Sequence, residues 1–250
     1  MTRLHNYLSE YKIPRSTSLT KEEATDLIHT KCKKILKLYK NTELRIIRGT
    51  SNHGSFALTD PSKGEPRRSA NTMNYVTLLV DHILPSWKDY PKRSKSLICS
   101  TIDGRTFYGS TTYVIFPYDK GKIGESTRRD WWISFPNLKA SIPNLNYALE
   151  KISNYIGIPL SETDPKKLER LLQKVDYDDV INATPLHVST LTNFRTGSFL
   201  EFLDDLLSPR NNNFKLKKSG QNLLKNVEVW TDSKCVLVDM MNKLLQDILI

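Results

Sequence analysis

The chain has 250 residues, of which 38% are hydrophobic and 26% are charged, and its formal net charge is +10. This composition is ordinary for a globular protein of one domain or two small ones. No stretch approaches the roughly 18 apolar residues that a membrane span needs, and the first residues lack the apolar centre of a signal peptide. We therefore expect a soluble cytoplasmic protein without a membrane partner. The surplus of lysine and arginine favours nucleic acid or nucleotide phosphates as ligands, although a basic surface also serves solubility.

Cysteines and histidines give little support for a metal site. The three cysteines, Cys32, Cys99 and Cys235, lie far apart in apolar surroundings and form no CxxC motif, so we expect buried thiols without a zinc site or a disulfide framework. No two of the five histidines have a short ligand spacing. His53, in a Gly/Ser-rich stretch, is either a site residue or an exposed loop histidine.

The first third of the chain contains the clearest helix. Residues 20–41 carry apolar side chains at helical spacing, and Thr20 with Glu23 forms a capping-box pattern at the start. A short strand is expected at 45–47, with Arg48 at its exit and Gly49 ending it. The polar stretch 51–72 is expected to be a long loop. A helical segment, 74–84, then ends at a proline.

Strands and helices follow in blocks. We expect strands at 95–101, 113–116 and 121–126, helices between 144 and 205, two strands about the "TDSK" turn, and a C-terminal helix. This grouping favours an α+β fold over a doubly wound sheet. Within a single domain, 1–250, the predicted parts are an N-terminal helical part, the first part of a β core, a helical insertion, and the final strands with the last helix: 1–43, 44–135, 141–208 and 222–250.

Three separated motifs resemble the mono-ADP-ribosyltransferases of the arginine–serine–glutamate group. "LRIIRG" places Arg48 at a strand after a helix, "LICST" ends in Ser100 and Thr101, and "NVE" ends in Glu228. Two positions differ from the family pattern: isoleucine follows Ser-Thr, where the family has serine, and Asn226 stands where the family has Glu or Gln. The resemblance implies a split β-sheet core with N-terminal helices and an inserted helical block.

The resemblance also implies a reaction and a set of roles. NAD would be the substrate, and its nicotinamide–ribose bond would break through an oxocarbenium-like cation that Glu228 stabilises electrostatically. Arg48 would bind the diphosphate as a planar, charged fork, Ser100 would orient Glu228, and Thr101 would stiffen the strand end. Tyr108, Tyr113 and Trp230 are alternatives for stacking on nicotinamide.

Further basic residues extend the predicted NAD site. Gly49 adjoins Arg48, and Arg67, Arg68 and Asn71 lie in the polar loop, where arginines beside small polar residues suit phosphate contact. The cations before "SLICST" are also candidates for phosphate contact: Lys92, Arg93 and Lys95. A solvated basic loop is the alternative in both places. Trp131 and Trp132 adjoin two arginines and are expected either to stack a nucleobase or to pack in the core.

Three functions compete. The first is NAD-dependent transfer of ADP-ribose to an intracellular macromolecule, a protein or a nucleic acid. The second is a non-catalytic, basic nucleic-acid-binding protein, such as a phage accessory or counter-defence factor, because one stretch also resembles proteins of tailed phages; the cytoplasm would then be that of the host. The third is a nuclease that uses carboxylates without convincing metal spacing: Asp60, Asp81 and Asp103.

Overall fold

The protein combines an antiparallel sheet with helices in a computed structural model that describes residues 16–66, 74–101, 111–135, 165–173 and 199–249. The strands are β1 (Ser16–Ser18), β2 (Ile47–Thr50), β3 (Phe56–Thr59), β4 (Leu97–Ser100), β5 (Thr111–Pro117), β6 (Lys122–Glu125), β7 (Lys215–Lys218), β8 (Glu228–Thr231) and β9 (Cys235–Asp239). The helices are α2 (Lys21–Lys31), α3 (Lys33–Asn41), α4 (Asn74–Leu78), α6 (Pro165–Leu172), α8 (Phe199–Leu207) and α9 (Lys243–Leu249). The α+β class is thus confirmed.

Contacts divide the chain into two compact units. The first contains Met1–Ala70, Tyr90–Trp131 and Lys215–Ile250, and the second contains Asn71–Asp89 and Trp132–Phe214. The expected helical block, 141–208, falls within the second unit. All nine described strands belong to the first unit.

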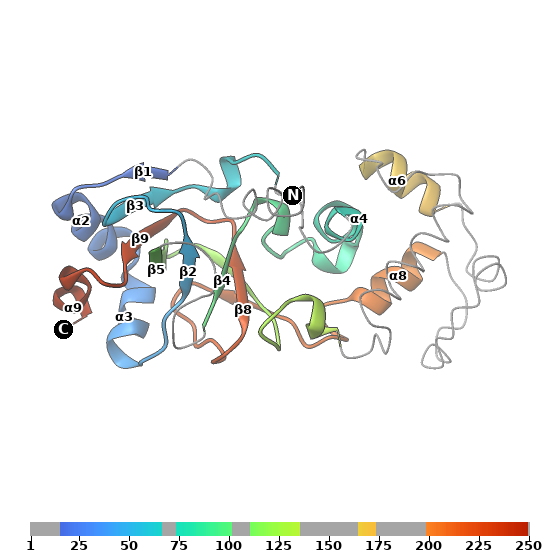
Figure 1. Cartoon of the computed structure of the whole chain (residues 1–250). Coiled ribbons are helices and arrows are strands. Elements are labelled where there is room, and N and C mark those ends of the chain that lie inside the picture. The colour runs from blue at the N-terminus through green and yellow to red at the C-terminus, as the bar shows by residue number, and fades with distance from the viewer. Residues whose placement is uncertain (1–15, 67–73, 102–110, 136–164, 174–198, 250) are drawn as a thin grey trace, which may run out of the picture. The chain divides into compact units, whose positions relative to one another are not determined.

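The sheet of the first unit has the order β1-β3-β9-β5-β2-β4-β8-β6-β7, and every described pairing is antiparallel (Figure 1). Helices α2 and α3 pack on it through an apolar core that includes Ile28, Ile35 and Phe116. The two strands about "TDSK" are confirmed as β8 and β9. They do not pair with each other, because β8 lies between β4 and β6 whereas β9 lies between β3 and β5.

The N-terminal helix is correctly located but interrupted. The capping box is present: Thr20 Oγ1 accepts from Glu23 N at 3.2 Å, and Glu23 Oε2 accepts from Thr20 N at 2.8 Å. Cys32 separates α2 from α3. Asp119 fills the break, since its N–H donates to Lys31 O and its Oδ1 accepts from Lys34 N, both at 2.7 Å. A distant turn therefore stabilises an interruption that helical periodicity does not reveal.

Three strand assignments differ from the expectation. Strand β2 begins later than predicted and contains Arg48 and Gly49, so Gly49 does not end it: it pairs with Thr112. Strand β3 lies inside the segment expected to be a loop, because four consecutive residues, Phe56 to Thr59, pair with β9. Strand β7 was not expected, since its sequence is lysine-rich.

The second unit has its own small aromatic core. Helix α4 continues into a π-helix, Leu79–Ile83, and the segment ends before Pro85 as expected. Trp87 donates from Nε1 to Leu207 O at 2.9 Å and lies edge-on to Phe214, with ring centroids 5.2 Å apart. Helices α6 and α8 confirm two of the predicted helices. The third, near 145–157, lies outside the described residues.

The thiols are buried as expected. Cys32, Cys99 and Cys235 are free, and all three belong to the first unit. Burial, followed by the charge of Asp119, raises the pKa of Cys32 to about 12.

Candidate functional site

Three neighbouring strands bring together the residues of the predicted motifs. Ser100, the last residue of β4, lies directly opposite Glu228, the first residue of β8, and also opposite Ile47 of β2. Arg48 follows Ile47, so all three motif residues lie at the same end of the sheet, where β2 and β8 begin and β4 ends (Figure 1). Residues more than 50 positions apart therefore become neighbours.

The side chains leave the sheet in two directions. Directly opposite residues share a face and consecutive residues alternate, so Ser100 and Glu228 lie on one face and Arg48 points to the other. The described pairing between β2 and β4 is limited to Ile47 and Ser100. Beside this pair, Arg48 Nη1 donates to the main-chain oxygen of Ile98. Arg48 thus connects β2 to β4 next to the Ser100–Glu228 pair.

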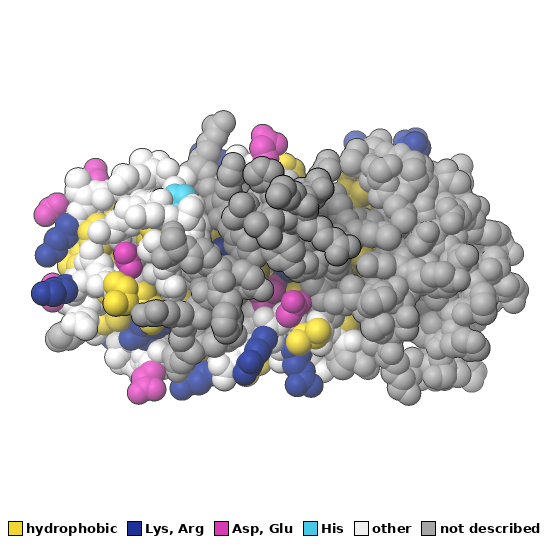
Figure 2. Space-filling view, viewed as in Figure 1, with side chains coloured by type: hydrophobic (Ala, Val, Ile, Leu, Met, Phe, Trp, Pro, Cys, Tyr) yellow, Lys and Arg dark blue, Asp and Glu magenta, His cyan; other side chains and the backbone are white. Residues whose placement is uncertain are grey.

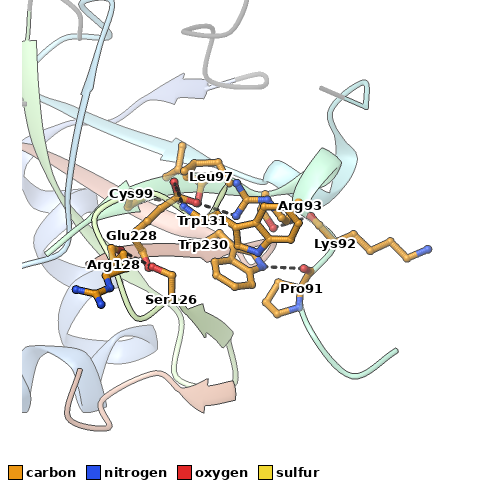
Figure 3. A network of polar contacts seen from close by, with 12 residues as sticks. Pro91, Lys92, Arg93, Leu97, Cys99, Ser126, Arg128, Trp131, Glu228 and Trp230 are labelled. Atoms are coloured by element: carbon orange, nitrogen blue, oxygen red, sulfur yellow. Dashed lines mark hydrogen bonds and ion pairs between the residues drawn. The ribbon is translucent and has the colours of Figure 1, made fainter. Parts of the chain in front are cut away.

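Glu228 forms a nearly buried ion pair that the sequence did not predict. Its Oε1 lies 2.7 Å from Arg93 Nη1, and the two side chains are only 14% and 9% exposed, respectively. The second oxygen, Oε2, accepts from the main-chain N–H of Trp131 at 3.3 Å. Figure 3 shows Arg93 and Trp131 converging on this carboxylate. They, and not Ser100, are its described hydrogen-bond donors.

Two tryptophans hold Arg93 in place. Its guanidinium lies 4.5 Å from the ring centroid of Trp131 and 5.1 Å from that of Trp230 (Figure 3). Trp230 is fixed in turn, because its Nε1 donates to Pro91 O at 2.9 Å and its ring lies over Gly124, where a Cβ would come within 2.1 Å. Cation–π contacts and the ion pair together set one position for Arg93 and therefore for the Glu228 carboxylate. We call these four residues the Arg93 cage: Arg93, Trp131, Glu228 and Trp230.

Thr101 positions the loop that leads into Glu228. Its Oγ1 lies 2.7 Å from Leu224 O and accepts from Val227 N at 3.1 Å, and its own N–H donates to Val227 O at 3.0 Å. The Ser100 hydroxyl is 3.5 Å from the same Val227 oxygen. The hydroxyls that end the "SLICST" strand thus bind the chain before Glu228.

Asn226 has a backbone reason for departing from the family pattern. Its φ is +60°, in the left-handed region. Among residues with a side chain, asparagine tolerates this conformation best. The backbone conformation of the turn before Glu228 is therefore sufficient to explain an asparagine here, and no role in contacting an ADP-ribose acceptor is needed.

The remaining predicted residues have mixed outcomes. Gly49 lies within β2, whereas Arg67, Arg68, Asn71 and Tyr108 lie outside the described residues. Tyr113 and Trp230 are each 0% exposed, so neither offers a face to nicotinamide. Trp131 is also buried and belongs to the core, and the side chain of Trp132 is outside the description.

His53 is half-buried in a polar cluster rather than fully exposed. Its Nδ1 lies 2.7 Å from Ser16 Oγ, its Nε2 lies 3.2 Å from Ser51 Oγ, and its main-chain N–H donates to Tyr113 Oη at 2.8 Å. Burial lowers the pKa of His53. These contacts connect the turn between β2 and β3 to β1 and β5.

A second buried glutamate lies on the next strand. Glu125 of β6 is 1% exposed, and its Oε2 accepts from Leu224 N at 2.7 Å. Burial raises the pKa of Glu125, while the Leu224 hydrogen bond and the charges of Lys217 and Lys215 act in the opposite direction. Glu125 therefore binds the same loop that Thr101 binds.

The carboxylates of the nuclease hypothesis do not form a cluster in the described part. Asp60 lies 3.8 Å from Lys63 and accepts from Ser62 Oγ, and Asp103 is outside the description. Within the described ranges, no three His, Cys, Asp or Glu side chains are grouped so that they could hold a metal ion.

None of the helices in the described segments is long and apolar enough to cross a membrane.

Comparison of the chain with protein-family models, curated proteins and solved structures finds no match.

Sequence reasoning missed Arg93 as the partner of Glu228. The run "PKRSKS" before β4 does mark three cations near the site. Lys92 is exposed and Arg93 is buried, but nothing in the run itself distinguishes them. The signal that could have helped is the presence of tryptophans in two distant segments, since a buried arginine is often stacked on aromatic rings.

Proposed function

We propose that the protein transfers ADP-ribose from NAD to a macromolecule, with Glu228 as the catalytic carboxylate. The observation that carries this proposal is the position of Arg48, Ser100 and Glu228 on three adjacent strands at one end of the sheet, with Ser100 directly opposite Glu228. We also propose that the nine-stranded sheet corresponds to the split β-sheet core of that family.

The contacts of Glu228 leave room for a ligand. A carboxylate has about four acceptor positions, and the described contacts use two of them, for Arg93 and for Trp131 N–H. A ribose hydroxyl could therefore bind a free position. The Arg93 cage fixes the carboxylate, and in this proposal it stabilises positive charge that develops on a bound ribose without moving.

The spacing of Arg48 suits the diphosphate of the same ligand. Arg48 and Glu228 lie two strands apart, roughly 10 Å at the usual strand separation. A dinucleotide that crosses the strand ends could reach side chains of both faces. The guanidinium of Arg48, which donates from Nη1 to Ile98 O, suits a phosphate by its permanent charge and fork geometry.

The test is nicotinamide release from NAD by the full chain, combined with transfer of labelled ADP-ribose into a cell lysate. Glu228→Gln is preferable to an alanine variant, because glutamine keeps an acceptor for Arg93 and avoids leaving the buried guanidinium unpaired. We expect release to fall by roughly 100-fold or more.

Glu125→Gln is the matched control, since it changes the other buried glutamate, one strand away. It should leave nicotinamide release unchanged. Treating the labelled lysate with nuclease or protease would identify the acceptor class. Folded wild-type protein that neither releases nicotinamide nor transfers label would contradict the proposal and leave the non-catalytic binding function.

A further inference from the structure

The whole chain has a formal net charge of +10, and part of its lysine lies in the first unit. On the face drawn in Figure 2, the described residues carry lysine and arginine side chains interspersed with acidic ones. Packing contacts identify one region where basic segments from distant parts of the sequence meet. It lies where α2 joins α3, beside the turns that flank β6, β7 and β9.

Main-chain contacts bring these segments together. Asp119 bonds to both sides of the α2–α3 break, as described above. Gly220 lies against Lys34, where a Cβ would come within 2.5 Å of the lysine Cβ. Ser219 N donates to Gly121 O at 2.9 Å, and Tyr118 N donates to Lys234 O at 3.0 Å. Four stretches of chain thus form one corner of the first unit.

Seven exposed lysines belong to this corner, which we call the lysine corner: Lys31, Lys33, Lys34, Lys120, Lys122, Lys218 and Lys234. Among the described residues, Lys33, Lys120 and Lys218 form no ion pair. The nearby carboxylates of Asp119 and Asp232 are half-buried, and Asp119 accepts from a main-chain N–H. The corner therefore presents more positive than negative charge to solvent.

Two of these lysines oppose each other directly. Lys122 of β6 is paired in register with Lys218 of β7. Directly opposite residues share a face of the sheet, so both lysine side chains lie on one face. A single polyanion could therefore contact both ammonium groups.

We propose that the lysine corner binds the phosphate backbone of nucleic acid. Lysines on several turns can contact successive phosphates, which gives affinity without sequence information. A membrane fits less well, because surface binding also requires apolar side chains that insert. The large apolar side chains exposed in the described part are Ile133, Leu216, Leu224, Met240 and Met241. Of these, Leu216 alone lies on a strand of the corner.

This site is separate from Glu228. Thr231, at the far end of β8, donates from Oγ1 to Lys122 O at 2.7 Å. Glu228 is three residues away along the strand, roughly 10 Å at the usual rise. The binding site is therefore independent of ADP-ribose transfer, although an acceptor held there would lie close to the proposed reaction centre.

The experiment measures binding of the full chain to a fluorescein-labelled 20-base-pair DNA duplex by anisotropy at several salt concentrations. The test variant is Lys33→Gln/Lys120→Gln/Lys218→Gln. The control, Lys21→Gln/Lys40→Gln/Lys225→Gln, removes the same charge from exposed lysines outside the corner. We expect the test variant to lose at least about tenfold in affinity. The slope of log K against log salt should shrink by about 2.7 if all three lysines contact phosphates, at about 0.9 per contact.

Three results would overturn the proposal: no binding by the wild type, equal loss in both triple variants, or binding to vesicles with 30% phosphatidylserine in place of DNA. Glu228→Gln should bind the duplex as the wild type does. Because this assay contains no NAD, its outcome is independent of whether the protein releases nicotinamide.

Discussion

Charged side chains are nearly buried at one end of strand β8 and exposed at the other. At one end, the Arg93 cage encloses Glu228, and the side chains of the ion pair are 9% and 14% exposed. At the other end, Lys122 faces Lys218 in solvent. A buried charge requires a fixed partner because its desolvation is costly. An exposed charge keeps its hydration and can be contacted by a ligand from solvent. The first region is therefore suited to positioning a group, and the second to attracting one.

The largest expected effect comes from breaking the buried pair. Arg93→Met leaves the Glu228 carboxylate buried without its cation, and we expect the free energy of unfolding to fall by about 3–5 kcal/mol. Urea denaturation of the purified variant measures this loss.

Arg93→Met/Glu228→Leu is the control for that variant, because removing both charges should recover most of the stability. If the single variant lost less than about 1 kcal/mol, the Arg93 cage would be no more important than a surface ion pair.

A smaller effect is expected at the turn before Glu228. Asn226→Ala places a Cβ-bearing residue without a polar side chain at a φ of +60°, and should cost roughly 1–2 kcal/mol. Asn226→Gly should retain stability within a few tenths of a kcal/mol because glycine adopts this conformation freely. Thermal unfolding of the two variants separates backbone strain from loss of the side chain; equal destabilisation would contradict the backbone explanation.

Glu125 predicts a pH dependence. Its pKa is raised in the folded protein, so the folded state favours the protonated form. This contribution to stability is complete below the pKa of the unfolded chain, near 4.5, and is lost as pH rises through the folded pKa. Glu125→Gln should abolish this change and stabilise the protein at pH 7 by about 1 kcal/mol or less. Denaturation midpoints between pH 4 and pH 7 provide the measurement; parallel pH profiles for the two proteins would refute it.

The smallest effect tests the lysine corner itself. Lys218→Glu places a carboxylate directly opposite Lys122, and a cross-strand pair of opposite charge should stabilise the sheet by about 0.2–1 kcal/mol at low salt. The same variant should bind the DNA duplex more weakly. A gain in stability without loss of affinity would show that the opposed lysines do not serve binding. Lys225→Glu, in the loop before β8, is the control for a simple change in net charge.

Local patterns predicted much of the fold, while long-range contacts determined the rest. The capping box of Thr20 and the apolar run of β4 act within a few residues, so sequence reasoning located both. Strand β7 lies at the edge of the sheet, where exposed lysines are common. Its sequence, "KLKK", therefore lacks the run of apolar residues by which a strand is predicted. The order of Arg48, Ser100 and Glu228 placed the candidate site on three strands. Its ion pair was beyond prediction because Arg93 and Glu228 are 135 positions apart.

The positions of the three thiols allow opening of the first unit to be measured by chemical labelling. All three cysteines lie in the first unit, on α2–α3, β4 and β9, and none lies in the second. A reagent such as a maleimide can modify them only when the sheet or its helical cover opens. The labelling rate therefore reports opening of the first unit alone, even in the intact chain, and NAD or a DNA duplex that binds there should slow it.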